Sequence, residues 1–455
     1  MKKILILGMA VALTGCGIYK PYSRPEVETD GLYGQEWETA DTTTIADVSW
    51  REMFTDPYLQ SLIEQGLENN LDLQSAGWRL EEAEASLKSA RLAFLPAFNL
   101  APQGSGSSFD GSKVTWTYNV PVTASWEIDI FSRLRNSKLQ AKALYAQSKE
   151  YRQAVRTQLI AGIANYYYTL LMLDKQYAIS LETAGKYKES VKTMQAMMDA
   201  GMTNRAGVSQ MEATYYSVEN SLRDMAQSIK KVENSLCLLL GEAPRAIERG
   251  SIDAQALPDR LLVGVPLQLL SRRPDVKSSE LALEQAFYGT AAARSALYPS
   301  LTLSGSAGWT NNAGMVVNPG KILLSAAGSL VQPLFNANAN RARVRIAQAQ
   351  QEEAKLSFQQ TLLNAGSEVN NALTQYQTAL SKVEWRNLQI ESLESAVEST
   401  QLLMQHSSTT YLEVLTAQQA LLSAQLSQVN DQFDRIQAVV NLYHALGGGR
   451  ETDAE

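Results

Sequence analysis

The feature that most constrains this chain is a stretch without proline that runs from about Ser132 to Met198. At 1.5 Å per residue, a helix of this length measures roughly 100 Å, more than the width of a compact globule of this size. A second such stretch runs from about Asn340 to His406, and two rods of this length in one chain predict a tube, a stalk or a filament. Large apolar residues recur in the first stretch at the three- and four-residue spacing of a coiled-coil seam. They are Tyr166, Leu170, Leu173, Tyr177, Leu181, Ala184, Tyr187, Val191, Met194 and Met198.

The first sixteen residues have the pattern of an export signal followed by a lipid-modified cysteine. Lys2 and Lys3 precede an apolar run from Ile4 to Leu13, which is typical of a signal peptide over residues 1–15. The run Leu13-Thr14-Gly15-Cys16 resembles a bacterial lipobox, and acyl chains on Cys16 would anchor the exported chain stably. The alternative is an ordinary signal peptide with a chance cysteine. No other run reaches about 18 apolar residues, the length that a transmembrane helix needs.

A stretch with a period of two lies between the predicted helices. The eleven residues 116–126 alternate between apolar and polar side chains, which predicts a β-strand. This length fits a tilted strand that crosses a bilayer, and Trp116 and Trp126 at its ends fit a membrane interface. Ala97 to about Gln103 is the expected partner strand, joined through a polar loop that starts with Gly104–Ser108. The alternative is a half-buried hairpin in a soluble sandwich.

The second half of the chain repeats the first. Asn70–Leu73 matches Arg273–Val276 at an offset of 203 residues, and Leu240-Gly241 matches Leu446-Gly447 at an offset of 206. Duplication of a whole helix-and-strand unit is more specific than the periodicity of any one segment. A second alternating strand pair follows at the equivalent place. One strand presents Leu301, Leu303, Gly305, Ala307 and Trp309 on one face, and its partner presents Ile322, Leu324, Ala326, Gly328 and Leu330.

We therefore divide the chain into two repeats with short flanking segments. Each repeat contains a helix, a strand pair, a long helix, a turn and a return helix. The signal peptide occupies 1–15 and a lipid-anchored strap 16–55; the first repeat is 56–241, a proline-containing connector 242–268, the second repeat 269–447 and the tail 448–455.

Two spanning strands per repeat give four per chain, and four strands cannot close a barrel. An open sheet edge is not tolerated in lipid, and single-chain barrels need at least eight strands. Closure therefore demands several copies. Two copies give eight strands, whose interior side chains fill, whereas three copies give twelve, enough for an aqueous lumen.

Four segments carry a resemblance to a known family. The chain resembles the outer membrane factor family, the TolC-like efflux channels, and within it the lipoprotein branch. The resemblance covers nearly all of the chain, with the distinctive segments in the same order. They are Tyr19-Lys20-Pro21 with Arg24-Pro25, Trp50 with Phe54, Asp56 and Pro57, Leu269-Leu270 before Arg272–Val276, and Leu442–Gly449.

The resemblance implies a mainly helical chain with a membrane β-sheet, assembled as a homotrimer. Three chains then form a twelve-stranded β-barrel, with four strands per chain, continuous with a long periplasmic α-helical barrel. The implied location is the outer membrane, with a lipid anchor and an extension into the periplasm. The implied function is a passive exit duct for small molecules, with a periplasmic adaptor and an inner-membrane pump as partners.

The resemblance also assigns site residues. Leu412 falls at the position of an apolar constriction, and together with Glu413 and Thr416 it would line the periplasmic aperture; Thr416 replaces an acidic residue that many members carry. The alternative for Leu412 is ordinary packing in the helical seam. Trp116, Trp126 and Trp309 are the expected membrane-interface aromatics. The adaptor-docking tip would consist of Gly201, Met202, Thr203, Asn204, Ser407, Ser408, Thr409 and Thr410.

Residues for catalysis or metal binding are sparse. The two histidines, His406 and His444, lie far apart in the sequence, and no nucleophile elbow, phosphate loop or zinc spacing occurs. With two cysteines a disulfide scaffold is excluded, and we interpret Cys237 as a small buried hydrophobe. A net charge of −7 gives no basic footprint for nucleic acid. We predict no enzyme, no cofactor and no metal.

Two other functions compete with the duct. A periplasmic adaptor would lack spanning strands, and a structural coiled-coil tether would not explain the duplicated strand pairs. Basic residues after each strand pair fit either anionic lipid head groups or solvated helix starts, and both readings stay open. They are Arg133, Arg135 and Lys138 in the first cluster and Arg341, Arg343 and Arg345 in the second.

Overall fold

The computed structural model describes residues 21–25, 48–255, 272–311, 321–406 and 411–450. The predicted signal peptide and the predicted lipidation site Cys16 lie outside the described residues. So do the tip residues Ser407, Ser408, Thr409 and Thr410, the part of the connector after residue 255, and the last residues of the tail.

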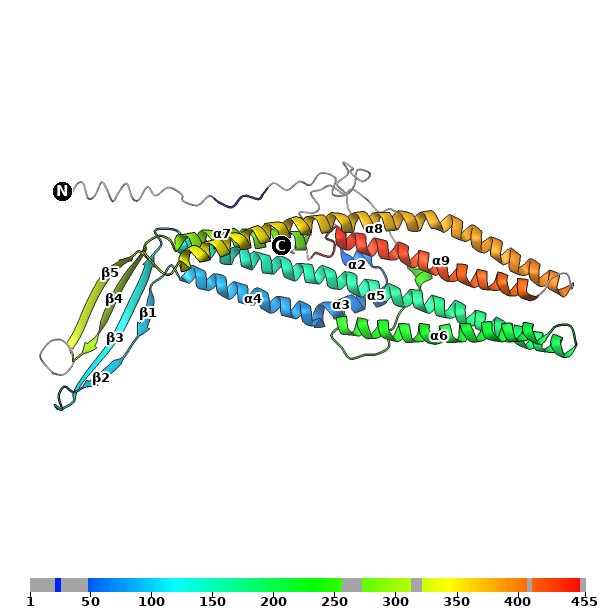
Figure 1. Cartoon of the computed structure of the whole chain (residues 1–455), viewed down its shortest axis with the longest axis horizontal. Helices are drawn as coiled ribbons and strands as arrows, with labels where there is room; N and C mark the ends of the chain where they lie inside the picture. The colour runs from blue at the N-terminus through cyan, green and yellow to red at the C-terminus, as the bar shows by residue number, and fades with distance from the viewer. Residues whose placement is uncertain (1–20, 26–47, 256–271, 312–320, 407–410, 451–455) are drawn as a thin grey trace. The chain divides into compact units, whose positions relative to one another are not determined.

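The predicted internal repeat is confirmed by the order and the lengths of the elements (Figure 1). Each repeat has a helix of 22 residues before its strands, a helix of 67 residues after them and a return helix of 35 residues. The first set is α4 (Leu71–Leu92), α5 (Arg133–Asp199) and α6 (Arg205–Leu239). The second set is α7 (Pro274–Ser295), α8 (Ala339–Gln405) and α9 (Tyr411–Ala445).

Short helices precede the first repeat. α3 (Pro57–Asn69) begins after Asp56, whose side chain accepts a hydrogen bond from the Tyr58 backbone N–H at 2.9 Å, with proline at the first helical position. α2 (Trp50–Met53) lies near the end of the segment assigned to the strap. Ser49 and Glu52 form a reciprocal capping box, and this cap together with the burial of Trp50 and Met53 stabilises one turn of helix. A short 3-10 helix, η2 (Ile252–Ala254), follows α6.

The chain divides into two compact units, and each unit takes residues from both repeats. The first unit contains residues 21–25, 78–150 and 277–361, apart from the gaps given above. The second contains residues 48–77, 151–276 and 362–450 with the same qualification. The strands belong to the first unit, and the return helices α6 and α9 belong to the second.

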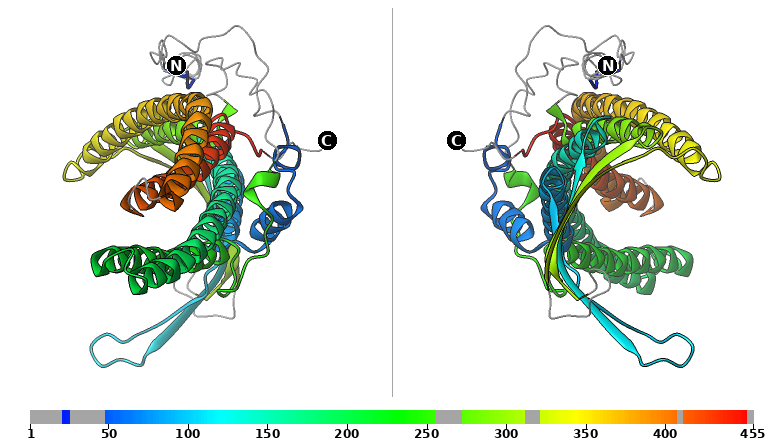
Figure 2. Two further views of the ribbon diagram at one scale, coloured as in Figure 1. Left: turned by 90° about the vertical axis from the view of Figure 1, so that its right-hand side faces the viewer. Right: turned by 90° about the vertical axis from the view of Figure 1, so that its left-hand side faces the viewer.

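The strands of the first unit form one antiparallel sheet, and they lie side by side in Figure 1 and in the right-hand view of Figure 2. The order is β1–β3–β4–β5, and β2 also pairs with β3. β3 and β4 come from different repeats and pair directly, so the sheet joins the two halves of the sequence. The bounds are β1 (Ala97–Leu100), β2 (Gln103–Ser107), β3 (Thr115–Ile128), β4 (Ser300–Thr310) and β5 (Lys321–Val331).

One segment expected as a loop is a strand. Gly104–Ser107 was expected to join the first strand pair, but it forms most of β2 and pairs with β3. The Trp116 ring lies over Gly106, where an added Cβ would be 3.0 Å from a ring carbon. A large ring that covers a strand glycine supplies the packing that the glycine itself lacks.

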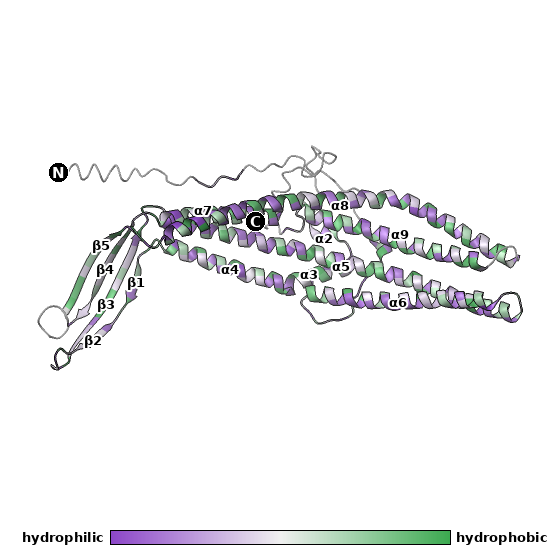
Figure 3. Ribbon diagram, in the orientation of Figure 1, coloured by the Kyte–Doolittle hydropathy of each residue, from purple (hydrophilic) through white to green (hydrophobic). Residues whose placement is uncertain are grey.

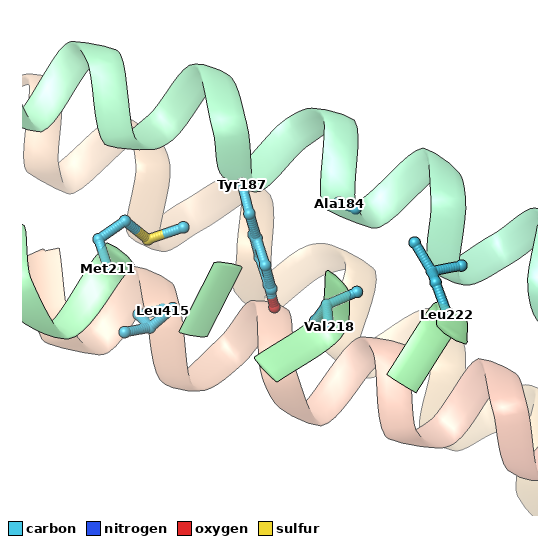
Figure 4. Packing of buried hydrophobic residues seen from close by; sticks show 6 residues of the cluster. All are labelled: Ala184, Tyr187, Met211, Val218, Leu222 and Leu415. Carbon is cyan, nitrogen blue, oxygen red and sulfur yellow. The ribbon is translucent and has the colours of Figure 1, made fainter. Parts of the chain in front are cut away.

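The second unit is held together by packing between helical hairpins. Ala184 and Tyr187 of α5 meet Met211, Val218 and Leu222 of α6 and Leu415 of α9 in one buried cluster (Figure 4). Ala184 and Tyr187 belong to the predicted seam, so this part of the seam is confirmed as core. None of the described helices combines the length and hydrophobicity needed to cross a membrane; along α5 and α8 hydrophilic and hydrophobic residues are mixed (Figure 3).

The return helices end in equivalent ways in the two repeats. The Asn70 side-chain amide donates a hydrogen bond to the Leu239 carbonyl at the end of α6, at 2.9 Å. Arg273, at the position that matches Asn70, donates to the Ala445 carbonyl at the end of α9, also at 2.9 Å. Free carbonyls at a helix C-terminus need such donors, so the duplicated sequence provides a duplicated cap.

The second cap is a charged network, whereas the first is neutral. The Arg273 side chain is 4% exposed and forms ion pairs with Asp275 and Glu368 at 2.7 Å each. His444 lies in the last turn of α9. Burial and the neighbouring Arg273 cation lower the pKa of His444 below its usual 6.5. The Arg272–Val276 motif therefore has a structural role, the capping of α9 by Arg273. The sequence alone offered no role for this motif.

Candidate functional site: a two-faced sheet and two helical hairpins

The strand register places the apolar side chains of the sheet on one face, as predicted. Val122, at the centre of β3, pairs with Leu100 of β1 on one side and with Ala307 of β4 on the other. Ala307 in turn pairs with Leu324 of β5. The large side chains of this apolar face are Phe98, Leu100, Trp116, Tyr118, Val120, Val122, Trp126, Leu303, Trp309, Ile322, Leu324 and Leu330.

The apolar face is exposed on the isolated chain. Leu324 is 73% exposed, Trp116 71% and Phe98 68%. Soluble proteins rarely expose a contiguous apolar patch that extends over a whole sheet, and such patches mark membrane or partner contacts. A strand face of this length and composition suits contact with lipid.

The opposite face of the sheet carries hydroxyl groups. Ser306 and Ser325 form a hydrogen bond between their side chains at 2.7 Å, and Ser105 and Thr117 form another at 2.8 Å. Leu323 of β5 is an apolar exception on this face, opposite Gly308. Hydroxyl groups that pair across strands can still form further hydrogen bonds, so they suit a face in contact with water.

Both edges of the sheet are open. Within the described residues, β5 pairs only with β4, while β1 and β2 pair only with β3. Each edge therefore presents backbone N–H and C=O groups without partners, which lipid does not tolerate. A membrane environment would require another strand at each edge.

The predicted interface aromatics lie at the two ends of the strands. Trp116 near the start of β3 and Trp309 near the end of β4 share one end, because the strands are antiparallel. Trp126 lies near the opposite end, where its indole N–H donates a hydrogen bond to the Phe94 carbonyl at 2.8 Å. These positions match two aromatic belts, and the assignment to membrane interfaces stays a prediction.

At the junction between β3 and α5, one residue of the first basic cluster pairs with an acidic residue of the same chain. Arg133 forms an ion pair with Glu127. The Asp129 carboxylate accepts hydrogen bonds from the Leu134 and Arg135 backbone N–H groups at 3.0 and 2.8 Å, and so caps the start of α5. The second cluster, Arg341, Arg343 and Arg345, is exposed. Both readings of the basic clusters stay open.

The turn between α5 and α6 is tightly defined. Gly201 has a φ of +74°, and its N–H donates to the Met198 carbonyl while the Met202 N–H donates to Met197. This is a Schellman ending, which needs a residue that tolerates positive φ. The Asn204 side chain accepts a hydrogen bond from the Gly207 N–H at 3.1 Å and starts α6. Met202 is exposed at this turn, Asn204 is exposed and Thr203 is half-buried.

Leu412 lies outside the seam of its hairpin. It is 52% exposed near the start of α9, whereas Val414 and Leu415 are 2% and 3% exposed and supply the packing. Thr416 lies one turn further along the same exposed side, and its hydroxyl donates to the Leu412 carbonyl at 2.8 Å. Glu413 is also exposed. The structure therefore argues against the seam alternative for Leu412, and the aperture assignment stays a prediction.

A buried charge cluster that sequence reasoning missed fixes the start of the connector. Arg249 forms ion pairs with Glu233 of α6 and with Asp174 of α5, and Lys230 also pairs with Glu233 at 2.7 Å. Burial raises the pKa of Glu233, but hydrogen bonds from Lys230 and Arg249 outweigh this and leave the pKa below its usual value. The sequence did contain one sign of this cluster: Glu233 lies four residues after Ile229, in a stripe of otherwise apolar helical positions.

No group of three or more metal-ligating His, Cys, Asp or Glu side chains occurs among the described residues. Cys237 is fully buried, as interpreted from its apolar neighbours, and its sulfur accepts a hydrogen bond from the Arg245 N–H at 3.4 Å.

Comparison with known proteins gives a consistent result. The model of the outer membrane efflux protein family matches residues 62–242 and 265–448. The chain is 27% identical over 453 residues to the cation efflux system protein CusC of Escherichia coli K12, covering 98% of this chain and 99% of CusC. It is 26% identical over 458 residues to the probable outer membrane lipoprotein SilC of Salmonella typhimurium, covering 98% of each. The open state of the Neisseria gonorrhoeae MtrE outer membrane channel matches with a TM-score of 0.85 and 27% identity, covering 97% of this chain and 100% of MtrE.

Proposed function

Because this chain belongs to the outer membrane efflux protein family, we propose that it is the exit channel of an efflux system and that three copies assemble to form it. The observation that carries the proposal is the sheet with one apolar face, one hydroxyl-bearing face and two open edges. The apolar face contacts lipid, the other face lines a water-filled lumen, and each open edge pairs with a neighbouring copy.

The number of copies follows from the width of the sheet. β1 and β2 occupy one position beside β3, so each chain supplies four strand positions. Three chains supply twelve, which leaves an aqueous lumen, and the hairpins of each chain continue the wall on the periplasmic side. The family is one of channels, and we propose that this chain performs no chemistry on what passes through it.

The assembly is tested by measuring mass and conductance together. Light scattering of the full-length protein in a neutral detergent should give about three times the 50.0 kDa of one chain, after subtraction of the detergent. The same particles should form conducting channels in a planar bilayer. A monomer that stays soluble without detergent would refute the proposal.

The partners are proposed to be a periplasmic adaptor and an inner-membrane pump, with Cys16 as the lipid anchor. Support for the anchor comes from the relative SilC, which is named a probable lipoprotein. Support for the docking site comes from the α5–α6 turn, which exposes Met202 in a rigid loop. Met202→Glu should abolish co-purification of the adaptor, while Met225→Glu, on α6 and away from the turn, should not. Cys16→Ser should remove the acyl mass from the N-terminal peptide, and an unchanged peptide mass would exclude lipidation.

The aperture is proposed to be a ring of Leu412 side chains, one from each copy. Leu412 is 52% exposed at the start of a return helix, outside the buried seam of Val414 and Leu415, and apolar rings gate pores by excluding water. Leu412→Ala should raise single-channel conductance. The matched control is Val414→Ala, which should destabilise the hairpin by about 2 kcal/mol and leave conductance unchanged. Equal conductance of Leu412→Ala and the unmodified protein would exclude this ring.

A further inference from the structure

A cavity of about 510 Å³ lies in the second unit, between α5, α8, α9 and η2. Its volume is typical of sites for small organic ligands. Its walls carry apolar side chains, Ile179, Val383 and Val429, next to charged ones. None of these residues belongs to the sheet or to the α5–α6 turn.

The charged lining residues are almost all paired with one another. Lys175 pairs with Asp253 at 2.6 Å and Lys186 pairs with Glu182 at 2.7 Å. Asp431, which is 6% exposed, pairs with Arg386 at 2.8 Å. Every carboxylate of the lining therefore has a cation beside it.

Arg435 is the cation that is left over. Among the residues that the structure describes, it forms no hydrogen bond or ion pair, and its Nε is fully buried without an acceptor. The side chain as a whole is half-buried and lines the cavity, so a ligand would reach its terminal guanidinium nitrogens and not the buried Nε. A partly buried cation without a counter-charge favours an anion. The four cations and three carboxylates of the lining leave a net charge of +1 at this side chain.

We propose that this cavity binds a singly charged organic anion, a monocarboxylate whose carboxylate pairs with Arg435. The planar guanidinium matches a carboxylate with two parallel hydrogen bonds. The apolar body of the ligand packs on Ile179, Val383 and Val429. A single negative charge cancels the excess charge of the lining, whereas a dianion would be repelled by Glu182 and Asp431. The proposal goes beyond the exit channel and does not depend on the number of copies.

The test is isothermal titration calorimetry on the full-length protein in a neutral detergent, with three probes of one shape. We expect 1-naphthoate to bind once per chain, and both the neutral 1-naphthamide and the doubly charged 1-naphthyl phosphate to bind at least tenfold more weakly. Arg435→Gln should weaken naphthoate binding by roughly tenfold to a hundredfold. The control is Arg223→Gln on α6, an exposed arginine outside the cavity, which should leave binding unchanged.

Two further measurements separate a ligand site from a structural role. Without ligand, Arg435→Gln should unfold at the same temperature as the unmodified protein or a higher one, and naphthoate should raise the unfolding temperature of the unmodified protein alone. Glu182→Gln removes a carboxylate from the lining and should strengthen naphthoate binding several-fold. Absence of naphthoate binding at millimolar concentration, equal binding of naphthoate and naphthamide, or unaltered affinity in Arg435→Gln would overturn the proposal.

Discussion

Placing one arginine on either face of the same strand tests which face of the sheet contacts lipid. Val122 and Thr123 are neighbours at the centre of β3 and point to opposite faces. Val122 is 47% exposed on the apolar face, and Thr123 lies on the face with the hydroxyl groups. An arginine at the middle of the lipid-facing surface of a barrel costs about 2–4 kcal/mol per chain. In a trimer this amounts to roughly 6–12 kcal/mol for the whole barrel, if the three sites act independently.

The control substitution carries the same side chain at a much smaller cost. Thr123→Arg loses the hydrogen bond from the Thr123 hydroxyl to the Asn99 carbonyl, which measures 3.3 Å and contributes about 1 kcal/mol. Its guanidinium reaches the lumen, where water solvates it. We therefore expect Val122→Arg to reduce the equilibrium between inserted and unfolded chain by roughly thirtyfold to a thousandfold per chain, and Thr123→Arg by roughly fivefold.

The assay is urea-induced unfolding from phospholipid vesicles, followed by tryptophan fluorescence, together with single-channel recording. Val122→Arg should shift the unfolding midpoint to lower urea, with normal conductance in the channels that do form. Thr123→Arg should insert normally, and its three lumenal charges should favour anions over cations. If Thr123→Arg proves the more destabilising of the two, or if both variants behave alike, the assignment of the faces is wrong.

Further predictions concern the caps of the return helices. Arg273→Met should lower the free energy of unfolding by about 2–3 kcal/mol, because the Ala445 carbonyl loses its donor and the half-exposed Asp275 and Glu368 lose their cation. Asn70→Ala in the first repeat should cost about 1–2 kcal/mol. Denaturant titration compares the two, and a larger loss in Asn70→Ala would contradict the cap account. The pKa of His444 is lower in the folded chain than its usual 6.5, so the unfolded chain binds the proton more readily. The stability that neutral His444 contributes is fully present above about pH 6.5. It is lost as the pH falls through the folded pKa. His444→Gln should therefore reduce the loss of stability between pH 7 and pH 5, measured as the urea midpoint at each pH, and an identical pH profile in the variant would exclude this role.

Much of the fold could be predicted because its signals are local. The helices α5 and α8 were predicted to within a residue or two, since their period and the absence of proline are properties of contiguous sequence. The Asp56 cap and the Schellman ending at Gly201 are equally local, because each involves only residues within a few positions. β2 was missed because Gly104–Ser107 has no apolar alternation, and its strand conformation depends on the Trp116 ring from β3.

The candidate site was predicted in part. The faces of the strands and the position of Trp126 follow from residue spacing and are visible in the structure. Leu412 was assigned from the family resemblance, and only the structure shows that it is exposed. The ion pairs of Glu233 and the cavity around Arg435 were not predicted. Asp174 and Arg249 are separated by 75 residues, and no local pattern connects them.

The sequence by itself determined the elements of this protein: their lengths, their order, their duplication, and the side of each strand that is apolar. These follow from periods of two and of three to four residues and from the backbone preferences of glycine, proline and capping residues, which act over a few positions. Only the tertiary structure decided that β3 and β4 pair across the two repeats, that Arg273 caps α9, and that Arg435 has no carboxylate partner within the described part of the chain. Each of these depends on which side chains meet across distant parts of the chain, and hydrogen bonds and ion pairs form only where packing brings donor and acceptor within about 3 Å.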